Sequence, residues 1–306
     1  MRRPPPGRMN RKTPVGSRLS LQSSRFNRIA LVIALPLLAL AGFFGYQFLV
    51  RAKNILQSSR PVPTSSAPTE AVQGIPRGPV PSETRSGPKI VLILDDVGFS
   101  SPQLEAASRL DARINFAVIP GSPHATEAAD LLRKRGHEIL CHQPMEPLGY
   151  PGVAPGEGAI LTSMSNQEIR RVALAGFRSI PHARGINNHM GSRATADARV
   201  MREVLVATRE LDAFFVDSRT TGRSVAGKLA RAMAVPTISR DVFLDDTNDE
   251  ASIRRQLAEL GELSEKHGIA VGIGHLYPDT IEVLTEEIPR LKKKGFRFVF
   301  ASEAVR

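Results

Sequence analysis

The sequence predicts a parallel α/β fold for residues 89–306, with a (β/α) barrel as the arrangement that fits best. Short apolar runs of strand length alternate with segments of helical periodicity, and this alternation is typical of parallel sheets with helical crossovers. Eight such runs and seven helical segments within 218 residues match the element count of a barrel. An open doubly wound sheet would give the same alternation and is the alternative.

The predicted strands are 89–95, 114–119, 137–142, 184–189, 213–217, 236–243, 269–274 and 296–301. Ser101 and Pro102 suit the start of the first helix, because Ser caps a helix and Pro fits its first turn. Ser165 and Glu168 form the capping box of a helix that runs to about Ile180. Three glycines stand where helices are expected to end: Gly136, Gly268 and Gly295.

The net charge of +11 belongs to the N-terminal part of the chain. Residues 1–88 hold 13 Lys/Arg and 2 Asp/Glu, whereas residues 89–306 hold 28 of each. The predicted barrel is therefore neutral and lacks the basic footprint of a nucleic-acid-binding domain. Nucleic acid is not expected among its partners.

Residues 29–50 have the length and composition of a transmembrane anchor. They contain no charged residue over 22 positions, and a helix of that length reaches about 33 Å, enough for a hydrocarbon core of about 30 Å. Eight Lys/Arg and no acid lie in residues 1–28, so the positive-inside rule predicts a basic cytoplasmic tail. The expected location is the inner membrane, single-pass, with the domain on the periplasmic side. A signal peptide cleaved near Ala39-Leu40-Ala41 is the alternative.

Residues 51–88 are rich in Pro, Ser, Thr and Gly and lack apolar periodicity. This composition predicts a disordered linker that holds the domain of residues 89–306 away from the membrane. Cys141 is the single cysteine of the chain, so no intrachain disulfide can form.

Acidic and imidazole side chains collect at the carboxyl ends of the predicted strands. They are Asp95, Asp96, His142, Glu146, His189, Asp217 and His275, with Asn187 and Asn188 beside them. In (β/α) barrels these strand ends lie at one face and carry the chemistry. His together with carboxylate suits zinc or another first-row divalent ion. The pattern therefore predicts a divalent-metal site, with zinc as the first choice.

Several motifs then resemble those of a known superfamily. ILDD, GHEILCHQPME, VDS, IGH and FRFVFASE are similar to motifs of the polysaccharide deacetylase superfamily of carbohydrate esterases. HQPMEP, NNHMGS and GIGH resemble its divergent branch, the divergent polysaccharide deacetylases of bacterial envelopes. The resemblance covers nearly all of residues 89–306. It implies a distorted (β/α) barrel of the glycoside hydrolase/deacetylase type and metal-dependent removal of acetyl groups from glycans.

The resemblance assigns a role to each residue of the first acidic pair. It implies that Asp95 is the general base and that Asp96 is a metal ligand. Neighbouring side chains on a strand point to opposite faces. The strand must therefore end or bend near Asp95, and Gly98 supplies local freedom for the bend.

The same resemblance assigns the remaining site residues. His142 matches the first metal-binding histidine, while Glu146 stands where the family has a second. His189, at the end of the next strand, is the alternative ligand. His275 matches the general acid, and Asp217 matches the carboxylate that tunes it.

The substrate contacts are expected to come from the loops around this site. The long Gly/Pro-rich stretch 145–161 carries Tyr150, and Tyr277 follows His275 by two positions. With Asn188 they are the expected substrate-binding residues. The chain contains no Trp, and Ser218 stands where the family usually has an aromatic residue after the Asp.

The function expected from these residues is that of a membrane-anchored, metal-dependent hydrolase acting on an acetylated cell-envelope glycan. An alternative is a barrel that kept a structural metal but lost turnover and serves as a binding or scaffold protein. The altered ligand position at Glu146 and the poor aromatic surface favour that alternative. A third hypothesis is hydrolysis of another ester or amide at the same metal.

Overall fold

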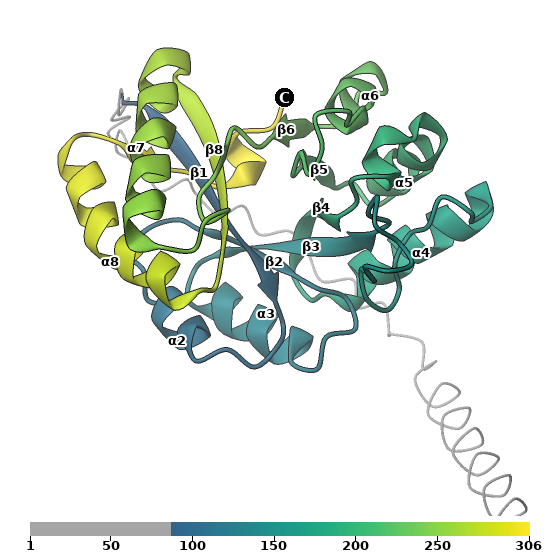
Figure 1. Ribbon diagram of the computed structural model, residues 1–306, viewed down its shortest axis with the longest axis horizontal. Helices are drawn as coiled ribbons and strands as arrows, with labels where there is room; N and C mark the ends of the chain where they lie inside the picture. Colours follow the sequence, from purple (N-terminus) through teal and green to yellow (C-terminus); the bar gives the residue numbers. More distant parts are fainter. Residues whose placement is uncertain (1–86) are drawn as a thin grey trace, which may run out of the picture. The chain divides into compact units, whose positions relative to one another are not determined.

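The structure is a computed structural model that describes residues 87–306. Nine strands form one parallel sheet that curves round on itself, in the order β6-β5-β4-β3-β2-β1-β8-β7, with β9 paired to the start of β1 (Figure 1). The strands are β1 (Lys89–Val97), β2 (Asn115–Val118), β3 (Glu138–Met145), β4 (Ala183–Met190), β5 (Phe214–Asp217), β6 (Thr237–Ser239), β7 (Val242–Phe243), β8 (Ile269–His275) and β9 (Arg297–Phe298).

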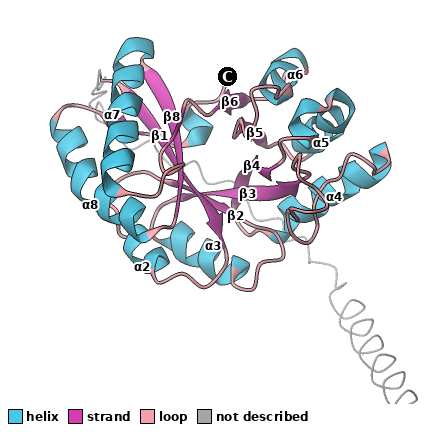
Figure 2. Ribbon diagram, viewed as in Figure 1, coloured by secondary structure: helices cyan, strands magenta, loops and turns pink. Residues whose placement is uncertain are grey.

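Helices alternate with the strands and lie on the outer side of the curved sheet (Figure 2). They are α2 (Gln103–Ala107), α3 (Ala125–Lys134), α4 (Asn166–Ser179), α5 (Ala198–Glu210), α6 (Ala226–Ala232), α7 (Glu250–His267) and α8 (Pro278–Lys293), with short 3-10 turns η1 (Ala194–Ala196) and η2 (Ala301–Glu303). The capping box of Ser165 and Glu168 is present at the start of α4, and Gly268 ends α7 in a left-handed conformation. The predicted parallel α/β class is therefore confirmed.

The ring of strands is open at one position. The predicted strand 236–243 is interrupted by Arg240 and Asp241, which join β6 to β7. Within residues 87–306 no ladder joins β6 to β7, which form the two edges of the sheet. The expected barrel is therefore an open one. Its strands follow the chain order without the reversal of a doubly wound sheet, so that alternative is wrong.

The central strand β1 is buried on both faces, which explains its continuous apolar sequence. Ile90, Leu92 and Leu94 belong to the larger core cluster, which also contains the buried faces of the helices. Val91 and Ile93 belong to a second cluster inside the curve of the sheet. All five side chains are fully buried.

The C-terminal segment closes the end of the barrel at which the strands begin. Ala301 and Ala304 pack in the inner cluster, and Thr237 at the start of β6 exchanges backbone hydrogen bonds with Arg306. Asn115, at the start of β2, accepts from the backbone N–H of Ala301 at 2.9 Å and donates to the carbonyl of Leu92 at 2.8 Å. The opposite end, where the strands finish, stays open.

Three of the predicted segments cannot be compared with the structure. The tail 1–28, the anchor 29–50 and all but the last two residues of the linker 51–88 lie outside the described residues. In the part of the chain that is described, no helix combines the length and apolar character needed to cross a bilayer.

Replacement of the fully buried Asn115 by alanine tests the closed end of the barrel. Asn115→Ala leaves the Leu92 carbonyl and the Ala301 N–H without this partner, so the free energy of unfolding is expected to fall by about 2–4 kcal/mol. Arg113→Ala, which removes an exposed ion pair to Glu303, is the control and should cost at most about 1 kcal/mol. Equal effects of the two variants in denaturant unfolding would contradict the role of Asn115.

Candidate metal centre

Two consecutive carboxylates reach one site because the backbone of β1 changes direction between them. Asp96 has φ of 61°, and the ladder from β1 to β2 shifts register between Leu94 and Val97. The predicted bend near Asp95 is thus confirmed, and Asp96 itself adopts the left-handed conformation. A non-glycine residue accepts such a conformation at a cost of order 1–3 kcal/mol, often at functional sites.

Asp96, His142 and His189 bring three ligand atoms together at the carboxyl ends of β1, β3 and β4. Asp96 Oδ1 lies 3.2 Å from His142 Nε2 and 2.8 Å from His189 Nδ1, and the two ring nitrogens are 3.2 Å apart. In residues 87–306 these are the three side chains that form such a group. The expected ligands Asp96, His142 and His189 therefore do converge.

Asn187 fixes the orientation of His142 from the next strand. His142 and Asn187 are paired across the β3–β4 ladder, and Nδ1–H of His142 donates to Asn187 Oδ1 at 2.8 Å. This bond leaves Nε2 facing Asp96. The amide nitrogen of Asn187 donates to Asp95 Oδ1 at 2.8 Å, so one side chain holds both a candidate ligand and the candidate base.

The geometry around Asp96 Oδ1 fits a bound cation. This buried oxygen has no hydrogen-bond partner, although two ring nitrogens lie within 3.2 Å of it. Three possible ligand atoms therefore face one point, an arrangement that a proton or a cation placed there stabilises. One carboxylate and two imidazoles suit zinc and related first-row ions. The group is thus consistent with a metal site of unspecified metal.

The charges of the site oppose one another over short distances. Burial raises the pKa of Asp95, and the neighbouring His142 and His275 offset only part of that rise. Burial also raises the pKa of Asp96, but the adjacent imidazoles of His142 and His189 lower it by more, so the net pKa is well below its usual range. Burial lowers the pKa of His142, while Asp95 and Asp96 raise it above its ordinary value. The carboxylates thus create a negative potential that favours positive charge.

His275 enters the site from β8, directly opposite Asp95 in the β1–β8 ladder. Its Nδ1 lies 3.0 Å from Asp245 Oδ1, and its Nε2 lies 3.8 Å from Asp96 Oδ2. Asp245 also accepts from the backbone N–H of His275 at 2.6 Å and from the Thr280 hydroxyl at 2.8 Å. Burial lowers the pKa of His275, but Asp245 outweighs it and the pKa rises to about 9.

The expected partner of His275 is therefore wrong. Asp217 accepts from the backbone N–H of Arg219 at 2.9 Å and from the Ser224 hydroxyl at 2.8 Å, and thereby fixes the turn between β5 and α6. Asp245 is the carboxylate that contacts His275. A signal for it was present in the sequence, because Leu244-Asp245-Asp246 repeats the Leu-Asp-Asp of β1.

Glu146 does not join the group of ligands. It is buried, and its Oε2 accepts from the backbone N–H and hydroxyl of Thr162, while Oε1 lies 3.4 Å from Arg193 Nε. These contacts brace the long loop after β3. Of the two expected alternatives for the third ligand, His189 is the one that the structure places there.

The three expected substrate contacts have different surroundings. Asn188 is buried, donates to the Met190 carbonyl and accepts from the Ser218 N–H, so it braces the backbone instead of facing a cleft. The Tyr277 ring is partly exposed and lies 5.2 Å from the His275 ring, beside the site as expected. Tyr150 is exposed in the long loop, and its role stays a prediction.

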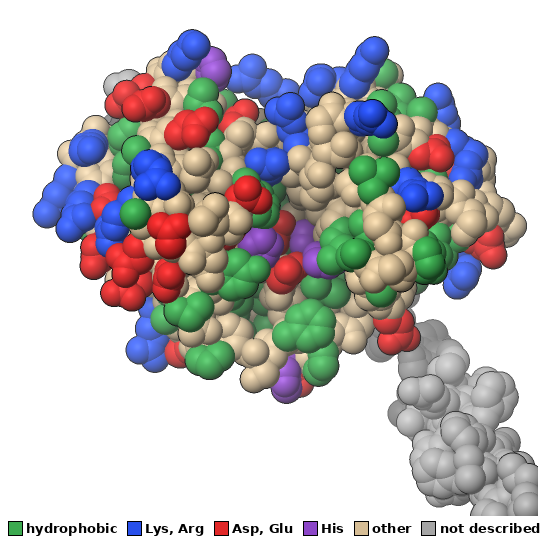
Figure 3. Space-filling model, viewed as in Figure 1, with side chains coloured by type: hydrophobic (Ala, Val, Ile, Leu, Met, Phe, Trp, Pro, Cys, Tyr) green, Lys and Arg blue, Asp and Glu red, His purple; other side chains and the backbone are tan. Residues whose placement is uncertain are grey.

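The site lies in a hollow of the molecular surface. Figure 3 shows histidine and acidic side chains gathered at the centre of one face, within this hollow. A cleft of about 450 Å³ opens beside Asp96 and His189, with Phe99 and residues 154–157 of the long loop among its walls. Asp96 and His189 are therefore accessible from this cleft, whereas His142 is buried behind them.

Fold and site together define an open (β/α) barrel with a candidate Asp/His metal site at the carboxyl ends of its strands. The sequence model of one family, described as divergent polysaccharide deacetylase, matches residues 92–305. The chain belongs to the divergent polysaccharide deacetylase family.

Two curated relatives and two solved structures are similar to this chain. An uncharacterized protein of Haemophilus influenzae is 37% identical over 64% of this chain and 69% of its own length. The uncharacterized protein YibQ of Escherichia coli is 36% identical over 66% of this chain, and the match covers 63% of YibQ.

Among solved structures, the uncharacterized protein ATU2773 of Agrobacterium tumefaciens has a TM-score of 0.69 and 25% identity, over 72% of this chain and 89% of that one. A putative cellobiose-phosphate cleavage protein of Enterococcus faecalis has a TM-score of 0.51 and 16% identity, over 72% of this chain and all of that one, which shows the fold alone.

Metal analysis tests the three-ligand group. Asp96→Asn removes the negative charge of one ligand and His142→Ala removes the donor nitrogen of another. The zinc retained by the purified protein after loading and dialysis is therefore expected to fall sharply in each variant, as measured by mass spectrometry. Glu146→Gln keeps the shape of a residue outside the group and should leave the metal content at the parent level. A loss of metal in Glu146→Gln with full occupancy in the other two variants would contradict this assignment.

Proposed function

We propose that this protein is a metal-dependent hydrolase that removes acetyl groups from a glycan of the cell envelope. The observation that carries the proposal is the placement of Asp95 and His275 around the three-ligand group, on adjacent strands and in register. Membership of the divergent polysaccharide deacetylase family supports a glycan as the substrate class. The two groups would serve as base and acid on either side of the reacting acetyl group.

Asp96, His142 and His189 would hold the metal. A divalent ion at this position supplies Lewis-acid polarisation of the acetyl carbonyl and activation of water. Asp95 would accept the proton of the attacking water. Its raised pKa brings it closer to neutrality, where a general base works best, and Asn187 fixes the orientation of its carboxylate.

His275 would return a proton to the departing nitrogen or oxygen of the sugar. Its Nδ1–H is directed at Asp245, so Nε2 carries the proton that faces the site when the ring is charged. The Asp245 carboxylate favours that charged form and keeps it populated at neutral pH. A general acid needs this combination of orientation and protonation.

The cellular setting of the proposal comes from the sequence of residues 1–88. An anchor at residues 29–50 would place the domain on the periplasmic side, and residues 51–88 would let it reach envelope glycans. The scaffold hypothesis is the second candidate, favoured by the absence of Trp and by Glu146 at a ligand position of the family. Turnover on an acetylated glycan separates the two.

Loss of the base or the acid should lower turnover without loss of metal. Asp95→Asn and His275→Ala are expected to reduce kcat for acetate release by about two to four orders of magnitude, as is usual for general acid–base groups. The assay uses a panel of acetylated envelope glycans, and metal content is measured alongside. Asp212→Asn, an exposed acid outside the site, is the control and should keep parent activity. A parent without activity on any of these glycans would support the scaffold hypothesis instead.

The pH dependence tests the corrected partner of His275. The acid must be protonated, so activity is expected to fall as pH rises through the pKa of His275, which is about 9. Asp245→Asn removes the charge that raises this pKa, so the falling limb of the kcat profile should move to lower pH. Asp217→Asn, in the β5–α6 turn, should leave the limb where it is. A shift in the second variant but not in the first would restore the original assignment.

A further inference from the structure

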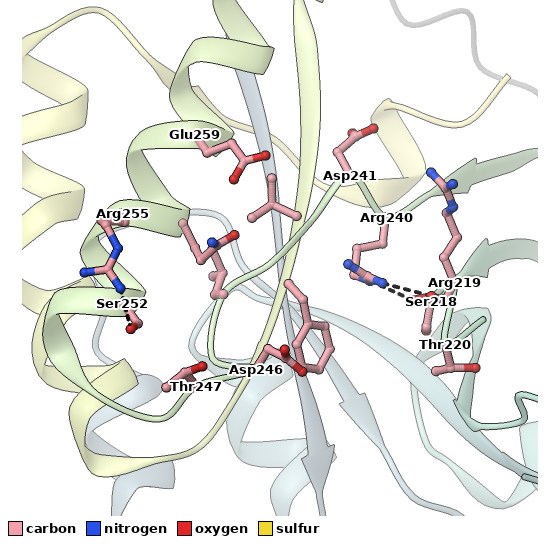
Figure 4. Close-up of a pocket in the computed structure, with 14 residues that line it drawn as sticks. Ser218, Arg219, Thr220, Arg240, Asp241, Asp246, Thr247, Ser252, Arg255 and Glu259 are labelled. Carbon is pink, nitrogen blue, oxygen red and sulfur yellow. Dashed lines mark hydrogen bonds between the residues drawn. The ribbon is translucent and has the colours of Figure 1, made fainter. Parts of the chain in front are cut away.

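The open position of the barrel contains a second cleft. It has a volume of about 600 Å³ and lies between the end of β5, the β6–β7 connection and α7 (Figure 4). Its walls are mostly polar and carry several arginines. The mechanism proposed above uses none of these residues.

Arg240 is fixed in one wall of this cleft. Its Nε donates to the Ser218 carbonyl at 2.7 Å, its Nη2 donates to the Arg219 carbonyl at 2.9 Å, and the guanidinium lies 5.0 Å from the centre of the Phe243 ring (Figure 4). The guanidinium is thus held on one edge by the backbone and on one face by an aromatic ring. A group held in this way loses little further freedom when it binds a ligand.

The remaining edge of Arg240 has no acidic partner. A guanidinium carries five N–H groups. Two of them are used by the carbonyls, which leaves three, including those on the Nη1–Nη2 edge. Within residues 87–306 neither Arg240 nor Arg219 has a carboxylate within ion-pair distance. Burial and then the charge of Arg219 lower the pKa of Arg240, and the nearby carboxylates of Asp217, Asp246 and Asp95 offset part of that fall. None of these carboxylates lies within ion-pair distance of the guanidinium, so its free edge remains available to an anionic ligand.

The turn that carries Arg219 is itself fixed in an unusual conformation. Arg219 has φ of 48°, and its N–H is held by Asp217, whose other oxygen accepts from Ser224. This left-handed turn directs the carbonyls of Ser218 and Arg219 at Arg240. Asp217 therefore positions the Arg240 guanidinium indirectly, by fixing the backbone turn whose carbonyls accept its hydrogen bonds.

Two of the three arginines of the cleft lie together on one wall. Figure 4 shows Arg219 and Arg240 on one side of the cleft and Arg255 and Glu259, both from α7, on the other. The carboxylate of Asp241 is occupied, because it accepts from the backbone N–H of Val271 at 2.8 Å. Asp241, Asp246 and Glu259 also line the cleft, so its positive charge is local to the neighbouring pair Arg219 and Arg240.

One aromatic ring separates this wall from the proposed acid. The Phe243 ring that lies beneath Arg240 also meets the His275 ring edge-on, with centroids 5.4 Å apart. A group bound by Arg240 would therefore be separated from His275 by the Phe243 ring. A substrate that spans both would place its acetyl group at the metal centre and a second group at Arg240.

We propose that Arg240, assisted by Arg219, binds a carboxylate of the substrate, so that the glycan is an acidic one with a carboxylate-bearing sugar next to the acetylated position. A planar carboxylate matches the free Nη1–Nη2 edge in a bidentate pair. The proposal rests on the function proposed above, because it assumes that a glycan binds at this end of the barrel.

Binding of two oligosaccharides to the full chain tests the proposal. The probes are a uronic-acid tetrasaccharide and its carboxyl-reduced neutral counterpart, and their affinities are measured by calorimetry at low and at high salt. The parent should bind the acidic probe about tenfold or more tightly, and this preference should shrink at high salt. Arg240→Gln and Arg219→Gln should each weaken binding of the acidic probe and leave that of the neutral probe unchanged.

The controls separate the proposal from simpler explanations. Arg255→Gln changes a cation on the opposite wall and should keep the preference of the parent. Arg219→Gln has no side-chain hydrogen bond to lose, so it remains informative if Arg240→Gln unfolds. Equal affinity of the parent for both probes, or equal losses in Arg219→Gln and Arg255→Gln, would overturn the proposal. Binding needs no turnover, so a parent that hydrolyses nothing but prefers the acidic probe through Arg219 contradicts the proposed hydrolase and supports this inference.

Discussion

The left-handed backbone of Asp96 is the constraint on which the site depends. A regular strand would send Asp95 and Asp96 to opposite faces of the sheet. The turn at Asp96 instead brings both carboxylates to His142, at 3.6 and 3.2 Å. The strained residue directly follows a run that is completely buried and is paired with β2, β8 and β9. A strand with three pairing partners therefore carries this left-handed residue.

Stability and chemistry are separated along the barrel axis. The end where the strands begin is closed by the C-terminal segment, through Asn115 and through Thr237. The end where they finish carries polar groups whose mutual repulsion would destabilise a core. The interruption of the ring between β6 and β7 adds space at this end and lets Arg240 reach the surface of a cleft. The break between β6 and β7 therefore leaves the sheet with two edges and makes room for this second cleft.

Much of the site could be predicted because strand ends are visible in the sequence. Asp95, Asp96, His142 and His275 each follow an apolar run, His189 ends a predicted strand, and the structure brings all five together. Asp245 is not among the predicted site residues, because the sequence pattern indicates a single strand over 236–243. Asp245 lies two positions beyond this range and is therefore not identified as a strand-end residue. The prediction of Glu146 as a possible metal ligand fails for a different reason. Its hydrogen-bond partner Thr162 lies in a loop, and sequence periodicity does not predict the conformation of that loop. The apolar periodicity of a sequence does not predict loop conformations that depend on individual long-range hydrogen bonds.

Asn187 has one amide group, and its two ends hold His142 and Asp95. A rotation of that amide cannot release one residue and keep the other. The position of the ring and the position of the carboxylate are therefore thermodynamically linked, and linkage is reciprocal. A ligand that fixes the orientation of the His142 ring should also order the Asp95 carboxylate. A ligand that binds Asp95 should in turn change the affinity of His142 for a metal ion. In the proposed hydrolase, ligand capture and proton transfer would therefore behave as one cooperative unit, coupled by an amide side chain that does not titrate.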